Sequence, residues 1–92
     1  MRIRSCELRH IRSLDMLLEQ LTLQLPLPGG QVYSLDALYD ALRHGVVGPF
    51  EIYWRDTDIA RQGLGIDLYA SILEILETIA RERGDVTLDI HH

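Results

Sequence analysis

One stretch of this sequence decides the fold that it predicts: Ser34-Leu35-Asp36-Ala37-Leu38-Tyr39-Asp40-Ala41-Leu42. Its apolar side chains recur at intervals of three and four residues, which is typical of one face of an amphipathic helix. Asp36 and Asp40 are four residues apart beside that face, so their carboxylates project in nearly the same direction. Two like charges aligned in this way cost the helix a little stability. Because two fixed anions suit a positively charged partner, the helix is a candidate for recognition.

The segments before this helix predict a strand and a first helix. Residues 1–8 alternate loosely, with Ile3 as the clearest inward residue. Ser13 is expected to cap a helix that continues to about Leu25, because leucines follow it at helical spacing. Prolines and glycines within 26–30 then end the helix and predict a loop.

The segments after the acidic helix continue this alternation of elements. That helix is expected to end at Gly45, and residues 50–54 alternate between apolar and polar side chains as a half-buried strand does. Asp56 is expected to cap a short helical turn through Arg61 that Gly63 and Gly65 close. A long helix over roughly 66–83 is predicted to follow.

A final alternating segment at 86–90 completes the order β-α-α-β-α-α-β. Strands that are separated by helical segments pair in parallel through right-handed crossovers. The sequence therefore predicts an α/β fold. The predicted three-stranded parallel sheet has helices packed mainly on one face, and its other face is partly exposed to solvent. Residues 1–92 are expected to form a single domain, because this length supports one core and leaves no room for a second.

Composition indicates a small cytoplasmic protein. Hydrophobic residues make up 47% and charged residues 25%, so a folded globular chain is expected rather than a disordered one. The first residues contain no apolar run, and no segment approaches the ~20 apolar residues of a membrane span. Neither a signal peptide nor a membrane contact is expected. Cys6 is the only cysteine, which excludes an internal disulfide and favours a reducing compartment.

The charge distribution argues against nucleic acid as a partner. The formal net charge is -5, and all nine basic residues are arginines, none of which lies between Arg12 and Arg43. That window holds the acidic residues Asp15, Glu19, Asp36 and Asp40. Phosphate contacts need clustered basic residues, whereas an uncompensated acidic surface steers basic partners toward it. Acidic surfaces also keep ordinary soluble proteins dispersed, so charge alone leaves both interpretations open.

An internal sequence echo, a pattern repeated at the start of two predicted helices, offers a structural explanation for the aspartates in place of a binding role. The echo is the stretch Ser13-Leu14-Asp15-Met16-Leu17-Leu18-Glu19-Gln20-Leu21, which also starts Ser-Leu-Asp and has an acidic residue four positions later. An aspartate in the first turn of any helix stabilises it by roughly 0.3–1 kcal/mol through the helix dipole. Asp36 therefore has a purely structural explanation. Asp40 lies beyond the first turn and gains little from the dipole, so it is the stronger candidate for binding.

The acidic stretch resembles the barstar family, which inhibits the bacterial ribonuclease barnase. The clearest part of the resemblance is the string Leu-Asp-Ala-Leu-aromatic-Asp over 35–40. Further matches, spread over nearly the whole chain, are Ile11-Arg12-Ser13, Leu27-Pro28, and Pro49 before a strand that ends Trp54-Arg55. The family fold is a three-stranded parallel sheet with helices packed on it, which agrees with the fold that the residue pattern predicts.

The resemblance implies a function and the residues that perform it. In the family, the matching helix and the loop before it plug the active site of the ribonuclease. The aspartate at the position of Asp40 occupies the phosphate pocket, and the one at Asp36 makes a second polar contact nearby. A carboxylate accepts paired hydrogen bonds from guanidinium much as phosphate does. The implied partner is a basic ribonuclease or ribonuclease toxin, bound by a monomeric inhibitor of the immunity or antitoxin type that needs no cofactor.

Some implied contacts depart from the family pattern. Where the family carries two loop aromatics, this chain has Gly30-Gln31-Val32-Tyr33-Ser34. Tyr33 either replaces the missing aromatic or is a half-buried residue at the start of the helix, and both interpretations remain open. Ser34 replaces an asparagine as the cap of the helix. Tyr39 stands where the family has tryptophan, and the preferred interpretation is core packing with its hydroxyl at the rim.

Two further positions are carried over together with alternatives. The family's tryptophan after the helix is matched by Gly45, with His44 beside it. Arg43 and His44 are also spaced to neutralise Asp40 as an exposed helix pair. The family's glutamate from the last helix aligns near Glu77, although a better register puts Thr78 there. These departures bear more on which ribonuclease is bound than on the fold.

Other classes of function fit less of the sequence. Catalysis is not expected, because the histidines and carboxylates fall in no spacing that implies a mechanism. No metal site is predicted either, since His91 and His92 would point to opposite faces of a strand. A non-inhibitory interaction module on the same scaffold remains the alternative, because one fold supports many functions and the loop aromatics are missing.

Overall fold

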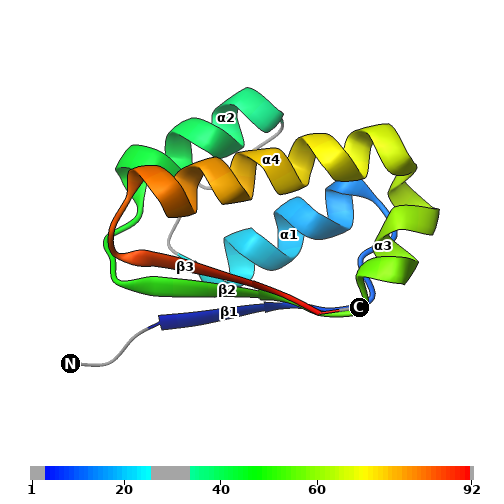
Figure 1. Cartoon of the computed structure of the whole chain (residues 1–92), viewed down its shortest axis with the longest axis horizontal. Coiled ribbons are helices and arrows are strands. Elements are labelled where there is room, and N and C mark those ends of the chain that lie inside the picture. Colours follow the sequence, from blue (N-terminus) through cyan, green and yellow to red (C-terminus); the bar gives the residue numbers. More distant parts are fainter. Residues whose placement is uncertain (1–3, 26–33, 92) are drawn as a thin grey trace.

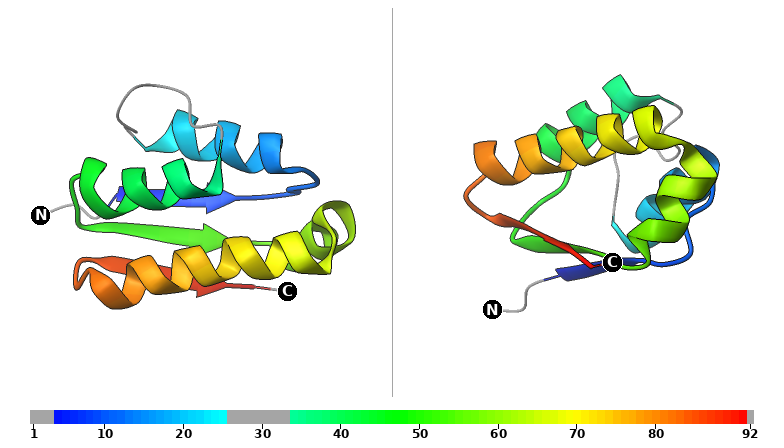
Figure 2. Two further views of the ribbon diagram at one scale, coloured as in Figure 1. Left: turned by 90° about the horizontal axis from the view of Figure 1, so that it is seen from above. Right: turned by 45° about the vertical axis from the view of Figure 1, so that its right-hand side comes forward.

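The computed structural model describes residues 4–25 and 34–91 and has the predicted α/β architecture (Figure 1). The elements in chain order are β1 (Arg4–Leu8), α1 (Leu14–Gln24), α2 (Leu35–Asp40), the π-helical turn η1 (Ala41–Gly45), β2 (Phe50–Trp54), α3 (Thr57–Leu64), α4 (Ile66–Glu82) and β3 (Val86–Ile90). The strands pair in parallel in the order β1-β2-β3. The helices lie on one face of this sheet (Figures 1 and 2), so the predicted order and fold class are confirmed. Ile3, the loop at 26–30 and Tyr33 lie outside the described residues.

The core lies between the sheet and the helices that cover it. Alternate strand residues are fully or almost fully buried beneath the helices: Cys6, Leu8, Phe50, Ile52 and Trp54. The residues between them face the uncovered side and are mostly polar, which is the period of two that a one-sided sheet requires. In β3 this alternation is weaker, because Leu88 and Ile90 are only partly buried at the edge of the sheet.

Both Ser-Leu-Asp sequences begin a helix in the same way. The hydroxyl of Ser13 accepts a hydrogen bond from the amide of Met16 at 3.2 Å, and that of Ser34 accepts one from Ala37 at 3.1 Å. Each hydroxyl satisfies an amide that the helix itself leaves without a partner. The echo in the sequence is therefore explained by helix capping, and the predicted starts of both helices are confirmed.

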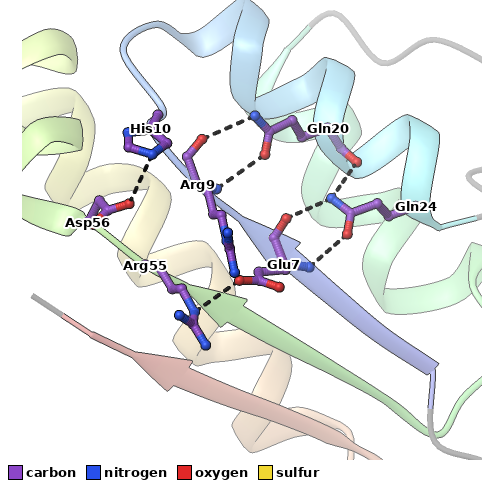
Figure 3. Close-up of polar contacts among 7 residues, drawn as sticks. All are labelled: Glu7, Arg9, His10, Gln20, Gln24, Arg55 and Asp56. Atoms are coloured by element: carbon purple, nitrogen blue, oxygen red, sulfur yellow. Dashed lines mark hydrogen bonds and ion pairs between the residues drawn. The ribbon is translucent and has the colours of Figure 1, made fainter.

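Asp56 is the N-cap residue of a short helix, as predicted, but its side chain does not cap it and the helix extends beyond Arg61. Asp56 has a left-handed backbone with φ of 56°, and its side chain makes no capping hydrogen bond. Its carboxylate lies instead 3.7 Å from Nε2 of His10, which also has a positive φ at the end of the neighbouring strand (Figure 3). The helix runs past Gly63 to Leu64 and ends at Gly65, its C-cap. A Cβ at Gly63 would lie 2.5 Å from the carbonyl oxygen of Arg12, so this glycine permits close packing.

Two glutamines of α1 bind the outer edge of β1 (Figure 3). The side-chain amide of Gln24 accepts from the amide of Glu7 at 2.8 Å and donates to its carbonyl at 2.7 Å. Gln20, one turn earlier, makes the same pair of bonds to Arg9 at 3.3 and 3.2 Å. An edge strand with free backbone groups is a template for pairing with another chain. The glutamines take the place of a fourth strand along this part of the edge.

We expect Gln24→Ala to lower the free energy of unfolding by about 1–2 kcal/mol, because both backbone groups of partly buried Glu7 lose their partner. Urea unfolding measures the change. Gln62→Ala is the matched control, since Gln62 is exposed on α3 and makes no side-chain hydrogen bond to another described residue. Equal effects of the two substitutions would contradict this role for Gln24.

Cys6 is a buried free thiol on β1, and burial raises the pKa of this thiol to about 12. Because the thiolate is the reactive form, we expect iodoacetamide to label Cys6 at pH 8 only when the chain unfolds. In the unfolded chain the thiol ionises near 9.0. Burial of the neutral thiol therefore stabilises the fold fully below that pH and progressively less as the pH rises toward 12. Mass spectrometry after labelling, with and without urea, checks this, and fast labelling of the folded chain would contradict it.

Candidate functional site

Helix α2 presents its two aspartates to solvent and its leucines to the core. Leu38 is fully buried, whereas Asp36 and Asp40 are exposed. Seen from the helix side of the molecule, α2 lies between α1 and α4 (Figure 2, left). The helix has a fixed start at Ser34, whose hydroxyl is occupied by the cap. The two carboxylates therefore project from a helix that the fold holds in place.

In the part of the chain that the structure describes, neither aspartate is neutralised by a neighbour. Within the described residues, Asp36 and Asp40 make no ion pair and accept no hydrogen bond from a side chain. Arg43, which is spaced to pair with Asp40 in an α-helix, binds Glu82 of α4 instead, with Nε 3.0 Å from Oε2. His44 is exposed and makes no ion pair with another residue in the described ranges. The carboxylate of Asp40 is therefore exposed and pairs with no side chain of the described residues.

The geometry of the chain after Asp40 explains this outcome. The α-helical pattern ends at Asp40 and a π-helical turn begins at Ala41. A π-helix rotates less per residue than an α-helix, so the side chain of Arg43, three positions later, lies further around the helix axis from Asp40 than it would in an α-helix. Such turns are rare and occur often at functional sites. The sequence carried no signal that predicts this turn.

Tyr39 joins α2 to α4 through a short polar chain. Its ring is partly buried against the core, and its hydroxyl donates to Glu82, whose oxygens lie 2.9 and 3.0 Å away. Arg43 donates to the same hydroxyl at 3.2 Å, and its guanidinium lies 5.7 Å from the ring centroid. The hydrogen bond to Glu82 raises the pKa of the tyrosine hydroxyl. This geometry agrees with packing of the ring and a hydroxyl at the rim.

The α4 carboxylate beside α2 is that of Glu82. Glu77 is exposed on the same helix, but five residues separate the two, which rotates their side chains by about 140° around the helix axis. Thr78, four residues before Glu82, shares its face. The structure therefore brings Glu82 and not Glu77 against Tyr39. Sequence reasoning missed Glu82 because the contact joins residues 43 positions apart and leaves no local pattern.

Comparison with known proteins shows the family of this chain. The sequence model described as Barstar (barnase inhibitor) matches residues 1–91. The chain belongs to the barstar family. A comparison with curated proteins finds no match. The barstar match covers essentially the whole chain, including α2 and the exposed aspartates on it.

Barstar-family proteins are inhibitors that bind a ribonuclease and do not catalyse a reaction. The described part of this chain holds no group of three or more metal-ligating side chains. Among the same residues, no helix is both long enough and apolar enough to cross a membrane.

Proposed function

We propose that this chain inhibits a basic ribonuclease by inserting the acidic surface of α2 into the enzyme's active site. The observation that carries the proposal is the pair of exposed carboxylates, Asp36 and Asp40, that no described side chain neutralises. A ribonuclease active site must bind phosphate with cationic side chains. A carboxylate accepts the same charge-assisted hydrogen bonds and so competes with the RNA backbone for them.

The rigidity of α2 supports tight binding. Association costs less free energy when the contacting groups are already ordered. Here the helix begins at the Ser34 cap, buries Leu38 and is tied to α4 through Tyr39. An uncompensated acidic surface also raises the association rate with a basic partner, and this effect weakens as salt screens the charges. Inhibition should therefore set in more slowly at high ionic strength.

The proposal includes a setting for the protein. A ribonuclease made in the same cell must be blocked before it meets cellular RNA, so an immunity or antitoxin role in the cytoplasm is proposed. Cys6, a free thiol without exposed surface, is compatible with a reducing compartment. The free inhibitor is proposed to be a monomer.

The test is RNA cleavage by a barnase-type ribonuclease titrated with this protein. We expect cleavage to fall linearly and to vanish at one inhibitor per enzyme, as it does when binding is much tighter than the concentrations used. Circular dichroism of the same sample shows whether the protein is folded. A folded protein that leaves cleavage unchanged would contradict inhibition of this class of enzyme.

A non-inhibitory interaction module on the same scaffold is the second candidate. The observation that favours it is the sequence of residues 30–34, which lacks the two aromatics of the family's binding loop. A neighbouring gene for a small basic ribonuclease or toxin favours inhibition, whereas an isolated gene favours the module. The titration above separates the two directly.

A further inference from the structure

The side chain of Arg83 is the most extensively bonded in the described part of the molecule. Nη1 donates to the carbonyl oxygens of Leu42 and Val46, both at 2.8 Å. Nε and Nη2 donate to the two carboxylate oxygens of Asp85 at 3.0 and 2.8 Å. The guanidinium lies 5.1 Å from the ring centroid of Phe50, and only 16% of the side chain is exposed. The hydrogen bonds from Arg83 lower the pKa of Asp85.

The carbonyls that Arg83 binds belong to the end of the acidic helix. Leu42 lies in η1 and Val46 is its C-terminal cap. The last carbonyls of a helix have no partner within the helix and must find one elsewhere. A stretch as short as α2 with η1 is unstable without support from the rest of the fold. Ser34 secures its first turn, and Arg83 secures its last.

The surroundings are shaped to admit this guanidinium. A Cβ at Gly48 would lie 1.9 Å from Oδ2 of Asp85 and 2.9 Å from Nη2 of Arg83. A side chain at position 48 would therefore require the Asp85 carboxylate and the Arg83 guanidinium to shift. Asp85 fixes the far side of the guanidinium, so Nη1 is directed at the helix end. Lysine at position 83 would retain the charge but lose this fork of donors.

We propose that Arg83 is a positioning residue, which holds the end of the α2–η1 helix so that Asp40 meets the partner in one fixed orientation. Asp40 precedes Leu42 by two residues, so a shift of the bound carbonyl moves the carboxylate with it. Arg83 itself is largely buried and acts through the helix. The inference rests on the proposed function for its effect on binding, but its effect on the helix is measured in the free protein.

The first test is amide hydrogen exchange of the free protein by NMR, in Arg83→Lys and in the control Arg81→Lys. Arg81 is exposed in the last turn of α4, the helix that Arg83 follows, and among the described residues its side chain bonds only to Thr78. In Arg83→Lys we expect amides of residues 38–46 to exchange about tenfold faster, because bonds to charged groups are lost there, and those of α1 and the sheet to change less. In Arg81→Lys no segment should change.

The second test is the rate of dissociation from a barnase-type ribonuclease, measured well below the unfolding temperature. Arg83→Lys should dissociate about tenfold faster than the native chain, and Arg81→Lys should not. Equal loss of protection in every segment, or unchanged dissociation of a variant with a loosened helix, would overturn the inference. If Arg83→Lys does not fold, Asp85→Asn tests the same point more gently, since it only removes the carboxylate that directs the fork.

The two proposals fail in different ways. If the native chain does not inhibit a ribonuclease while the exchange result holds, inhibition is contradicted and the fixing of the helix by Arg83 is supported. If the native chain inhibits and Arg83→Lys neither loosens residues 38–46 nor speeds dissociation, the inference about Arg83 is overturned and inhibition is supported.

Discussion

Replacing Asp40 with alanine should weaken binding to the target ribonuclease by about 4 kcal/mol or more, roughly a thousandfold, while leaving folding intact. The loss is large because the carboxylate would be buried against cationic groups that are then left without a partner. The upper end of the range for such truncations comes from the barnase–barstar pair itself, so this magnitude is taken over from the family. Inhibition titrations with native protein and variant measure it.

Asp40→Ala should lose binding while its free energy of unfolding stays nearly unchanged. Asp40 is exposed and makes no ion pair among the described residues, so the free energy of unfolding should change by less than about 0.5 kcal/mol. Asp15→Ala and Glu19→Ala are matched controls, because both residues are exposed on α1 in the echo of the acidic stretch. They should leave inhibition intact. An Asp40→Ala variant that binds as tightly as the native chain would contradict the assignment of the site.

The parts of the fold that the sequence predicted are those with a local cause. Ser13 and Ser34 cap their helices through amides three residues later, and alternation of apolar residues along 50–54 follows from a sheet covered on one face. Each of these patterns is complete within a few residues, so a sequence displays it fully. The exposure of Asp36 and Asp40 is of the same kind, since helical spacing alone puts them beside the buried stripe.

The parts that were missed depend on contacts between distant segments. Glu82 meets Tyr39, and Arg83 meets Leu42, across more than 40 positions of the chain. Which face of α4 turns toward α2 is decided by how the helices pack on the sheet. The π-helical turn after Asp40 also lies where a distant residue binds the chain, since Arg83 donates to the carbonyls of Leu42 and Val46.

The left-handed backbone of Asp56 shows why a capping rule failed locally. Aspartate is favoured both as a helix cap and in left-handed conformations. The sequence was interpreted by the first preference, whereas the chain uses the second and turns the carboxylate toward His10. The sequence alone does not show which of these two preferences of aspartate the chain uses, because the choice depends on where the neighbouring strand ends.

Replacing Leu38 with alanine should have the opposite effect to that of Asp40→Ala, a large loss of stability without a change in the contacts made to the partner. Leu38 is a fully buried residue of α2 that faces the core, so truncating it should lower the free energy of unfolding by about 2–5 kcal/mol. The total free energy of unfolding of a native domain is roughly 5–15 kcal/mol, so this loss would be a large part of it. Urea unfolding measures the loss. Leu23→Ala is the matched control, because Leu23 is 77% exposed on α1 and its truncation should change stability by less than about 0.5 kcal/mol.

The inhibition titration of Leu38→Ala then separates folding from recognition. A partner that binds only the folded chain draws unfolded molecules back into the complex, so weakened stability lowers the apparent affinity only by the unfolded fraction. With a tight target, Leu38→Ala should still reach complete inhibition at nearly the native stoichiometry. Asp40→Ala should remain folded and fail to reach it. If Leu38→Ala is folded and yet does not inhibit, the cavity beneath α2 has moved the carboxylates, and the orientation of the helix is as important for binding as their charge.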